Sequence, residues 1–205
     1  MKPLEDAIAR QIFEASTYER RDVEFKPPFA WTDTTSNWAK EKVIRAVIGM
    51  SNTKGGGYVV IGVDETTDHK ADLKGLDDTM LGTFENYEAV KGAIDGFVYG
   101  YVDFQIGIAE YDNLRYAVIA VSEFEETPNL CKKNGQENGI LVKDELYVRS
   151  KSSSPATIKA TDLELREILK MAADKEKVEL DARGFTRATE PNVVQYYKEI
   201  NKDLE

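Results

Sequence analysis

The stretch GGGYVVIGVD, residues 55–64, decides the fold of this chain. Its centre, residues 58–63, is apolar throughout, as in a central strand covered on both faces. The glycines before it tolerate the positive φ of a tight reversal, and Asp64 marks a polar exit. The stretch therefore predicts a buried strand entered directly from a turn.

A helix is predicted immediately before this turn, over residues 38–51. One helical stripe there carries Ala39, Val43, Ala46, Val47 and Met50. Further upstream, residues 22–26 alternate polar with apolar and predict a short strand, which ends at two prolines because proline lacks the N–H for a ladder. Residues 4–15 have helical spacing of apolar residues.

The clearest hairpin lies downstream, at 104–111 and 114–121, joined by Asp112-Asn113. We expect a loop over 65–82, a helix over 84–98, a long loop over 127–139 and a last strand over 146–149. Thr161 with Glu164 fits a capping box that starts a helix to about residue 180, and Pro191 fits the first turn of a terminal helix. The pattern predicts a mixed α/β (α+β) domain, a twisted mixed sheet flanked by helices, over 1–160, and a C-terminal helical extension over 161–205.

Composition narrows the class of protein. With 205 residues and 41% apolar residues, the chain suits one domain with an appendage. It has no apolar run near the ~20 residues of a membrane span, so we expect no membrane partner, and we see no secretory signal. Its single cysteine excludes an internal disulfide, and we expect a cytoplasmic protein.

Charge is unevenly distributed. The formal net charge is −10, and residues 62–126 hold 15 Asp/Glu against 4 Lys/Arg. Any polyanion must therefore bind through local basic surface, because the overall field repels it.

Three carboxylates stand out at the start of the chain. Glu24 faces away from the core if Val23 and Phe25 face it, and it can share a cleft with Asp64 if their strands are neighbours. With Glu19, such a cleft suits Mg²⁺ or Mn²⁺, hard cations that prefer oxygen ligands and promote phosphodiester hydrolysis. Spacing alone leaves open that all three are solvated surface charges.

Three blocks of sequence carry a resemblance to a known family. They are VEFK (23–26), SNT with the stretch above (51–64), and YVRSKSSSPAT (147–157). In order and spacing they resemble the AlbA-like domain shared with Schlafen proteins, over about residues 19–160. The resemblance implies either a metal-dependent endoribonuclease on structured RNA, with Glu19, Glu24 and Asp64 as its catalytic and metal-binding residues, or a non-catalytic DNA-binding, transcription-regulator module.

The sequence departs from the Schlafen pattern in two ways. Arg20 stands where a serine commonly follows the first glutamate, and there is one copy of a unit that Schlafen proteins carry as two lobes. We therefore expect a homodimer to complete the groove, and the survival of all three carboxylates favours the nuclease. A protein-interaction role remains a further alternative.

The family's older label of ATP binding is disfavoured by the order of elements. A phosphate-binding loop leads from a strand into a helix N-terminus, whereas these glycines leave a helix and enter a strand. No G-x-x-x-x-G-K-[ST] motif is present. A tight reversal explains the glycines, so we expect positive φ at one of them at least.

Basic residues near the family blocks are candidates for contacts to the phosphates of RNA or DNA. The predicted nucleic-acid-binding residues are Arg20, Arg21, Lys26, Lys132, Lys133, Arg149, Lys151 and Ser152. For Lys132 and Lys133 the alternative is a solvated loop.

Overall fold

A five-stranded mixed sheet forms the centre of the computed structural model, which describes residues 2–14, 19–66, 70–137, 139–151 and 156–183. The strand order is β1-β7-β8-β3-β2. The strands are β1 (Lys2–Pro3), β2 (Val23–Lys26), β3 (Gly57–Ile61), β7 (Phe104–Tyr111) and β8 (Leu114–Val121). β2 runs parallel to β3 and β1 parallel to β7, whereas β8 is antiparallel to both of its neighbours. This confirms the predicted mixed α+β class.

The predicted central strand occupies an interior place in this sheet. β3 lies between β2 and β8, and Val59, Val60 and Ile61 are completely buried. The strand is shorter than predicted because Gly62 has φ 115° and bends the chain. Residues Val63–Glu65 then form β4, which pairs with β5 (Ala71–Leu73) in a separate antiparallel ribbon.

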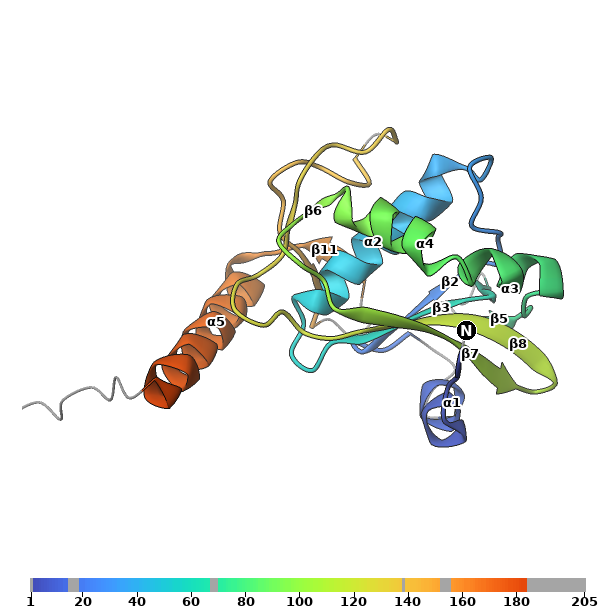
Figure 1. Ribbon diagram of the computed structural model, residues 1–205, viewed down its shortest axis with the longest axis horizontal. Helices are drawn as coiled ribbons and strands as arrows, with labels where there is room; N and C mark the ends of the chain where they lie inside the picture. Colours follow the sequence, from blue (N-terminus) through green and yellow to red (C-terminus); the bar gives the residue numbers. More distant parts are fainter. Residues whose placement is uncertain (1, 15–18, 67–69, 138, 152–155, 184–205) are drawn as a thin grey trace, which may run out of the picture.

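Helices cover both faces of the sheet (Figure 1). On one face lie α2 (Asn37–Ser51), α3 (Asp78–Phe84) and α4 (Tyr87–Asp95), packed over the larger hydrophobic core. On the other face α1 (Asp6–Phe13) contributes Ile12 and Phe13 to a second core with Val23 and Phe25. The alternation predicted for residues 22–26 thus directs Glu24 to the α2 side of the sheet.

The hairpin is confirmed residue by residue. β7 and β8 pair from Phe104↔Val121 to Tyr111↔Leu114. Asp112 and Asn113 have φ of 52° and 59°, the left-handed values of a two-residue hairpin turn.

Two stretches differ from the prediction. Residues 65–82, expected as a loop, contain β5 and most of α3, and the helix expected over 84–98 is α4, which is shorter at both ends. The side chains of Asp77 and Asn86 accept N–H bonds from Met80 and Ala89 and start α3 and α4 separately. The Asn86 cap explains why α4 starts later than the predicted helix.

The glycine block forms the expected reversal between α2 and β3. Gly55 and Gly56 have φ of 80° and 70°. A side chain on Gly56 would place its Cβ 2.0 Å from the carbonyl oxygen of Val121. The N–H of Gly55 donates to the Glu123 carboxylate, so this donor serves the fold rather than a bound phosphate.

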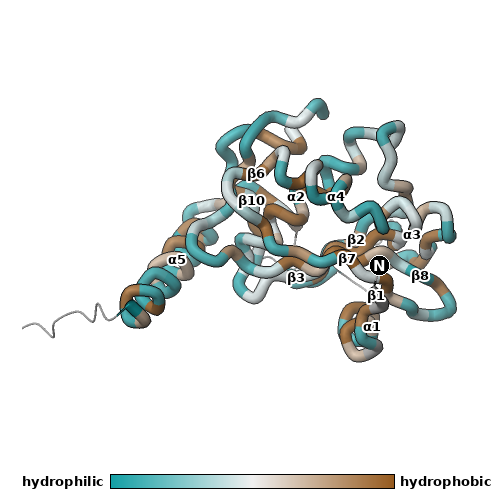
Figure 2. The backbone as a smooth tube through the Cα atoms, in the orientation of Figure 1, coloured by the Kyte–Doolittle hydropathy of each residue, from teal (hydrophilic) through white to brown (hydrophobic). Residues whose placement is uncertain are grey.

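The rest of the chain adds small pairs and one long helix. β6 (Val98–Tyr99) pairs with β9 (Leu130–Cys131), and β10 (Tyr147–Arg149) pairs with β11 (Thr157–Lys159). The capping box is confirmed, and α5 (Asp162–Ala182) extends away from the sheet (Figure 1), with apolar and polar residues interspersed along it (Figure 2). In the described part of the chain, no helix has the length and apolar character to cross a bilayer. The terminal helix predicted from Pro191 lies outside the described residues.

Candidate functional site

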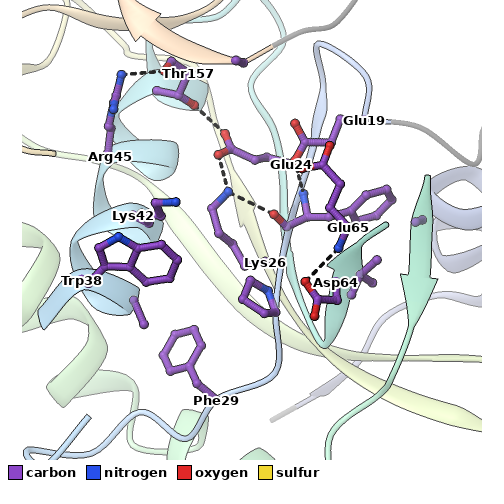
Figure 3. A pocket seen from close by; sticks show the side chains of 16 residues that line it. Glu19, Glu24, Lys26, Phe29, Trp38, Lys42, Arg45, Asp64, Glu65 and Thr157 are labelled. Carbon is purple, nitrogen blue, oxygen red and sulfur yellow. Dashed lines mark hydrogen bonds and ion pairs between the residues drawn. The ribbon is translucent and has the colours of Figure 1, made fainter. Parts of the chain in front are cut away.

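A cleft of about 460 Å³ opens beside the α2-facing side of β2. It is lined by β2 and the segments that flank it, the first half of α2, the β4–β5 ribbon and the start of β11. All three predicted carboxylates, Glu19, Glu24 and Asp64, line it (Figure 3). The cleft therefore brings together residues that lie far apart in the sequence.

Glu24 lies at the base of the cleft and is 7% exposed. It pairs with Lys26 Nζ, accepts 2.6 Å from Arg149 Nη1, and accepts from the Thr157 hydroxyl. Burial acts to raise the pKa of Glu24, but the charges of Lys26 and Arg149 and the hydrogen bonds outweigh it and hold the pKa below its ordinary value. Glu24 is thus an anion with its cations already in place.

Glu19 lies next to it and is less well compensated. One oxygen accepts from the Phe25 N–H at 2.9 Å, and the other lies 3.4 Å from Arg149 Nη2. Burial, with the nearby charge of Glu24, raises the pKa of Glu19, although Lys26 and Arg149 oppose the shift. The neighbouring carboxylates therefore have pKa values shifted in opposite directions.

Arg149 corrects the sequence prediction. It was expected to contact phosphate, but its side chain is completely buried. Besides the two glutamates, its guanidinium donates to the backbone carbonyls of Arg20 at 2.8 Å and Val23 at 3.1 Å. These contacts tie β10 to the segment before β2, so Arg149 serves the fold and holds the glutamates.

Asp64 stands on the opposite side of the cleft, on β4. It is exposed, and one of its carboxylate oxygens accepts 2.9 Å from the N–H of Glu65. The β4–β5 ribbon that follows the bend at Gly62 places it there.

The carboxylates do not fit a divalent metal ion as they are arranged. Among the described residues, no three His, Cys, Asp or Glu side chains are grouped so that they could hold a metal. The reason is local, because Glu24 and Glu19 direct oxygens to Arg149, Lys26 and backbone N–H rather than to a common centre. A hard cation needs several such oxygens converging on one point.

Most of the predicted basic residues are engaged within the fold. Arg20 pairs with Asp22 at 3.0 Å, and both Arg21 and Lys151 pair with Glu167 of α5, at 2.7 and 3.0 Å. These ion pairs neutralise the charges that sequence reasoning assigned to phosphate.

The remaining predicted nucleic-acid-binding positions differ in where they lie relative to the cleft. Lys26 does line the cleft, paired with Glu24. Lys132 and Lys133 are exposed and do not line it. Ser152 lies outside the described residues.

The cleft also has a cationic and aromatic wall that the sequence analysis missed. It is formed by Trp38, Lys42 and Arg45 on α2 (Figure 3). Lys42 Nζ lies 3.8 Å from the centre of the Trp38 ring, and Arg45 Nη2 donates 2.8 Å to the Thr157 carbonyl. The sequence does contain a sign of this wall: the three residues have i, i+4, i+7 spacing on the predicted helix, and residues at this spacing share one helix face.

Lys42 is positive in a crowded position. Burial lowers its pKa, and the charges of Lys26 and Arg45 lower it further. No ion pair joins Lys42 or Arg45 to a carboxylate among the described residues, and Arg45 donates there only to the Thr157 carbonyl. This wall is therefore open to an anion.

Comparisons with known proteins bear on this region directly. The model of the family described as Schlafen, AlbA_2 matches residues 19–157, a range that contains every residue lining the cleft and more than half of the chain. No curated protein matches the sequence.

Two solved structures show a loose likeness. The DIP2311 protein of Corynebacterium diphtheriae aligns at 18% identity and a TM-score of 0.44, over 73% of this chain and 24% of that one. The N-terminal domain of a RecG-related protein of Nitrosomonas europaea aligns at 16% identity and a TM-score of 0.45, over 79% and 97%. The chain thus spans about a quarter of the length of the first of these proteins.

Proposed function

Because this chain belongs to the Schlafen AlbA_2 family, which indicates a function connected with nucleic acid, we propose that it binds nucleic acid through the cleft beside β2. One observation carries the proposal. Lys42 and Arg45 line this cleft without a carboxylate partner in the described part of the chain, whereas most cations nominated from the sequence are paired. Unpaired cations in a hollow are the groups that attract phosphates to a protein of negative net charge.

A binding assay tests this proposal. We would measure fluorescence anisotropy of fluorescein-labelled DNA and RNA, single-stranded and duplex, in EDTA over a range of salt. Replacing both Lys42 and Arg45 by Gln should weaken binding, and the slope of log affinity against log salt should fall by about 1.5 units if both contact phosphate.

The matched control replaces Lys132 and Lys133 by Gln. It removes the same number of charges from an exposed loop outside the cleft, so binding should change little. If the loop variant loses binding and the cleft variant keeps it, the site is elsewhere. If the unmodified protein binds none of the probes, the proposed function is wrong.

A second candidate function is the metal-dependent cleavage of structured RNA. It is favoured by the presence of Glu19, Glu24 and Asp64 in one cleft, although their present arrangement does not fit a metal. The test is incubation with structured RNA in Mn²⁺ or Mg²⁺ against EDTA. Asp64→Asn should abolish any cleavage without unfolding the protein, because Asp64 is exposed; equal cleavage by this variant would reject the assignment.

Two further properties stay proposals. A homodimer would supply a second lobe to the cleft, and light scattering at several concentrations would detect it. A cytoplasmic location rests on the single cysteine, and fractionation of cells expressing the tagged chain would test it.

A further inference from the structure

The two walls of the cleft carry opposite charge. Lys42 and Arg45 stand on the α2 wall beside Trp38, and Asp64 and Glu19 stand on the wall opposite (Figure 3). Between the walls, Lys26 Nζ is held by Glu24 and by the Phe25 carbonyl at 3.0 Å. A ligand that fills the cleft must therefore satisfy an anion-binding side and a side that accepts hydrogen bonds.

Groups on both walls have capacity left for a ligand. Within the part of the chain that the structure describes, Lys42 has no ion pair, and the Arg45 guanidinium donates only to the Thr157 carbonyl, through Nη2. The hydrogen bond from the Glu65 N–H uses one oxygen of Asp64, and the carboxylate is exposed. Trp38 is 44% exposed and offers an aromatic surface beside Lys42.

This layout discriminates among ligands. A phosphodiester alone would be attracted by the cations of the α2 wall but repelled by the carboxylates of the opposite wall. A nucleotide presents a phosphate at one end, and at the other a base whose exocyclic amine donates to a carboxylate, as cytosine N4 does to Asp or Glu. The 460 Å³ of the cleft lies within the ~300–1,000 Å³ of small-molecule sites and is too small for a stacked duplex.

We propose that the cleft takes one unpaired, amine-bearing nucleotide of a single strand, with its phosphate at Lys42 and Arg45 and its base amine at Asp64. This inference rests on the proposed function, and it specifies the form of nucleic acid bound there. It predicts a preference for cytosine over thymine, because thymine has a carbonyl where cytosine has the amine.

The experiment is fluorescence anisotropy with labelled dC and dT 12-mers, their RNA counterparts and a 12-base-pair duplex, all in EDTA at pH 7.5. The unmodified protein should bind dC about tenfold more tightly than dT, and the duplex weakly. Asp64→Asn should reduce the affinity for dC to that for dT, since the Glu65 N–H holds the amide oxygen and leaves the NH2 group, a donor, facing the amine. Lys42→Gln should weaken both probes by the same factor and keep the preference.

Asp72→Asn is the matched control. Asp72 lies opposite Asp64 in the β4–β5 register but pairs with Lys74 and does not line the cleft, so its removal should leave the preference unchanged. Equal binding of dC and dT, or duplex binding as tight as dC, would overturn the inference while leaving the proposed function standing. A preference that survives Asp64→Asn would also overturn it. Failure to bind any probe would instead reject the proposed function.

Discussion

Replacing Arg149 by Met tests whether this residue serves the fold rather than the ligand. Methionine keeps a long side chain of similar reach but removes every guanidinium donor. Glu24 would lose its 2.6 Å partner, and the carbonyls of Arg20 and Val23 would lose theirs, all in the interior. Lys26 and Thr157 would still contact Glu24, so the charge of Lys26 would compensate in part for the lost guanidinium.

The expected cost is large for one substitution. Breaking a buried ion pair by removing one partner costs about 3–5 kcal/mol. In a protein of this size, that corresponds to a fall in melting temperature of roughly 6–20 °C. The stability of Arg149→Lys should lie between those of the unmodified protein and Arg149→Met, because an ammonium keeps the charge but cannot reproduce the planar fork of donors.

Chemical denaturation monitored by circular dichroism measures this cost. The control is Arg166→Met, which removes the 2.9 Å pair with Asp162 on the exposed side of α5 and should cost less than about 1 kcal/mol. A cycle with Glu24→Gln should show a coupling of ~0.5–3 kcal/mol between Arg149 and Glu24. If Arg149→Met costs no more than Arg166→Met, Arg149 does not stabilise the fold.

Two further predictions concern pH and the glycine block. The pKa of Glu24 is lowered, so its ionised form stabilises the fold above about pH 4.5, and this stability is lost as pH falls through the folded pKa. The pKa of Glu19 is raised, so its protonated form stabilises the fold below about pH 4.5, and this stability is lost as pH rises through the folded pKa. Denaturation from pH 3 to 7 should therefore show Glu24→Gln losing and Glu19→Gln gaining stability relative to the unmodified protein as pH rises, and parallel curves would contradict this. Gly56→Ala should cost about 3 kcal/mol or more because its Cβ would meet the carbonyl of Val121, whereas Gly55→Ala, with open space around it, should cost about 1 kcal/mol. Equal melting temperatures of these two variants would argue against the reversal as described.

Local sequence pattern predicted some features of the candidate site and could not predict others. Alternation along 22–26 separated Glu24 from Val23 and Phe25, and the family blocks directed attention to Glu19 and Asp64, which line one cleft. Arg149 was assigned wrongly, because a sequence shows a charge but not its burial. The pairing of Arg21 with Glu167 was equally invisible, since it joins residues 146 positions apart.

The sequence by itself determined the elements whose causes are local. Apolar periodicity set α2, the Asp112-Asn113 turn set the hairpin register, and the Thr161 capping box set the start of α5. Each depends on residues within a few positions of one another, so the chain needs no distant partner to express the preference.

Tertiary structure decided the electrostatics of the cleft. Trp38, Lys42 and Arg45 became one wall only because α2 packs beside β2 and β11, and Asp64 faced them only after Gly62 turned β4 away from the sheet. Whether a charge is paired or left open to a ligand depends on distances between segments that the fold brings together. Those distances follow from the packing of the whole core, which no local pattern contains.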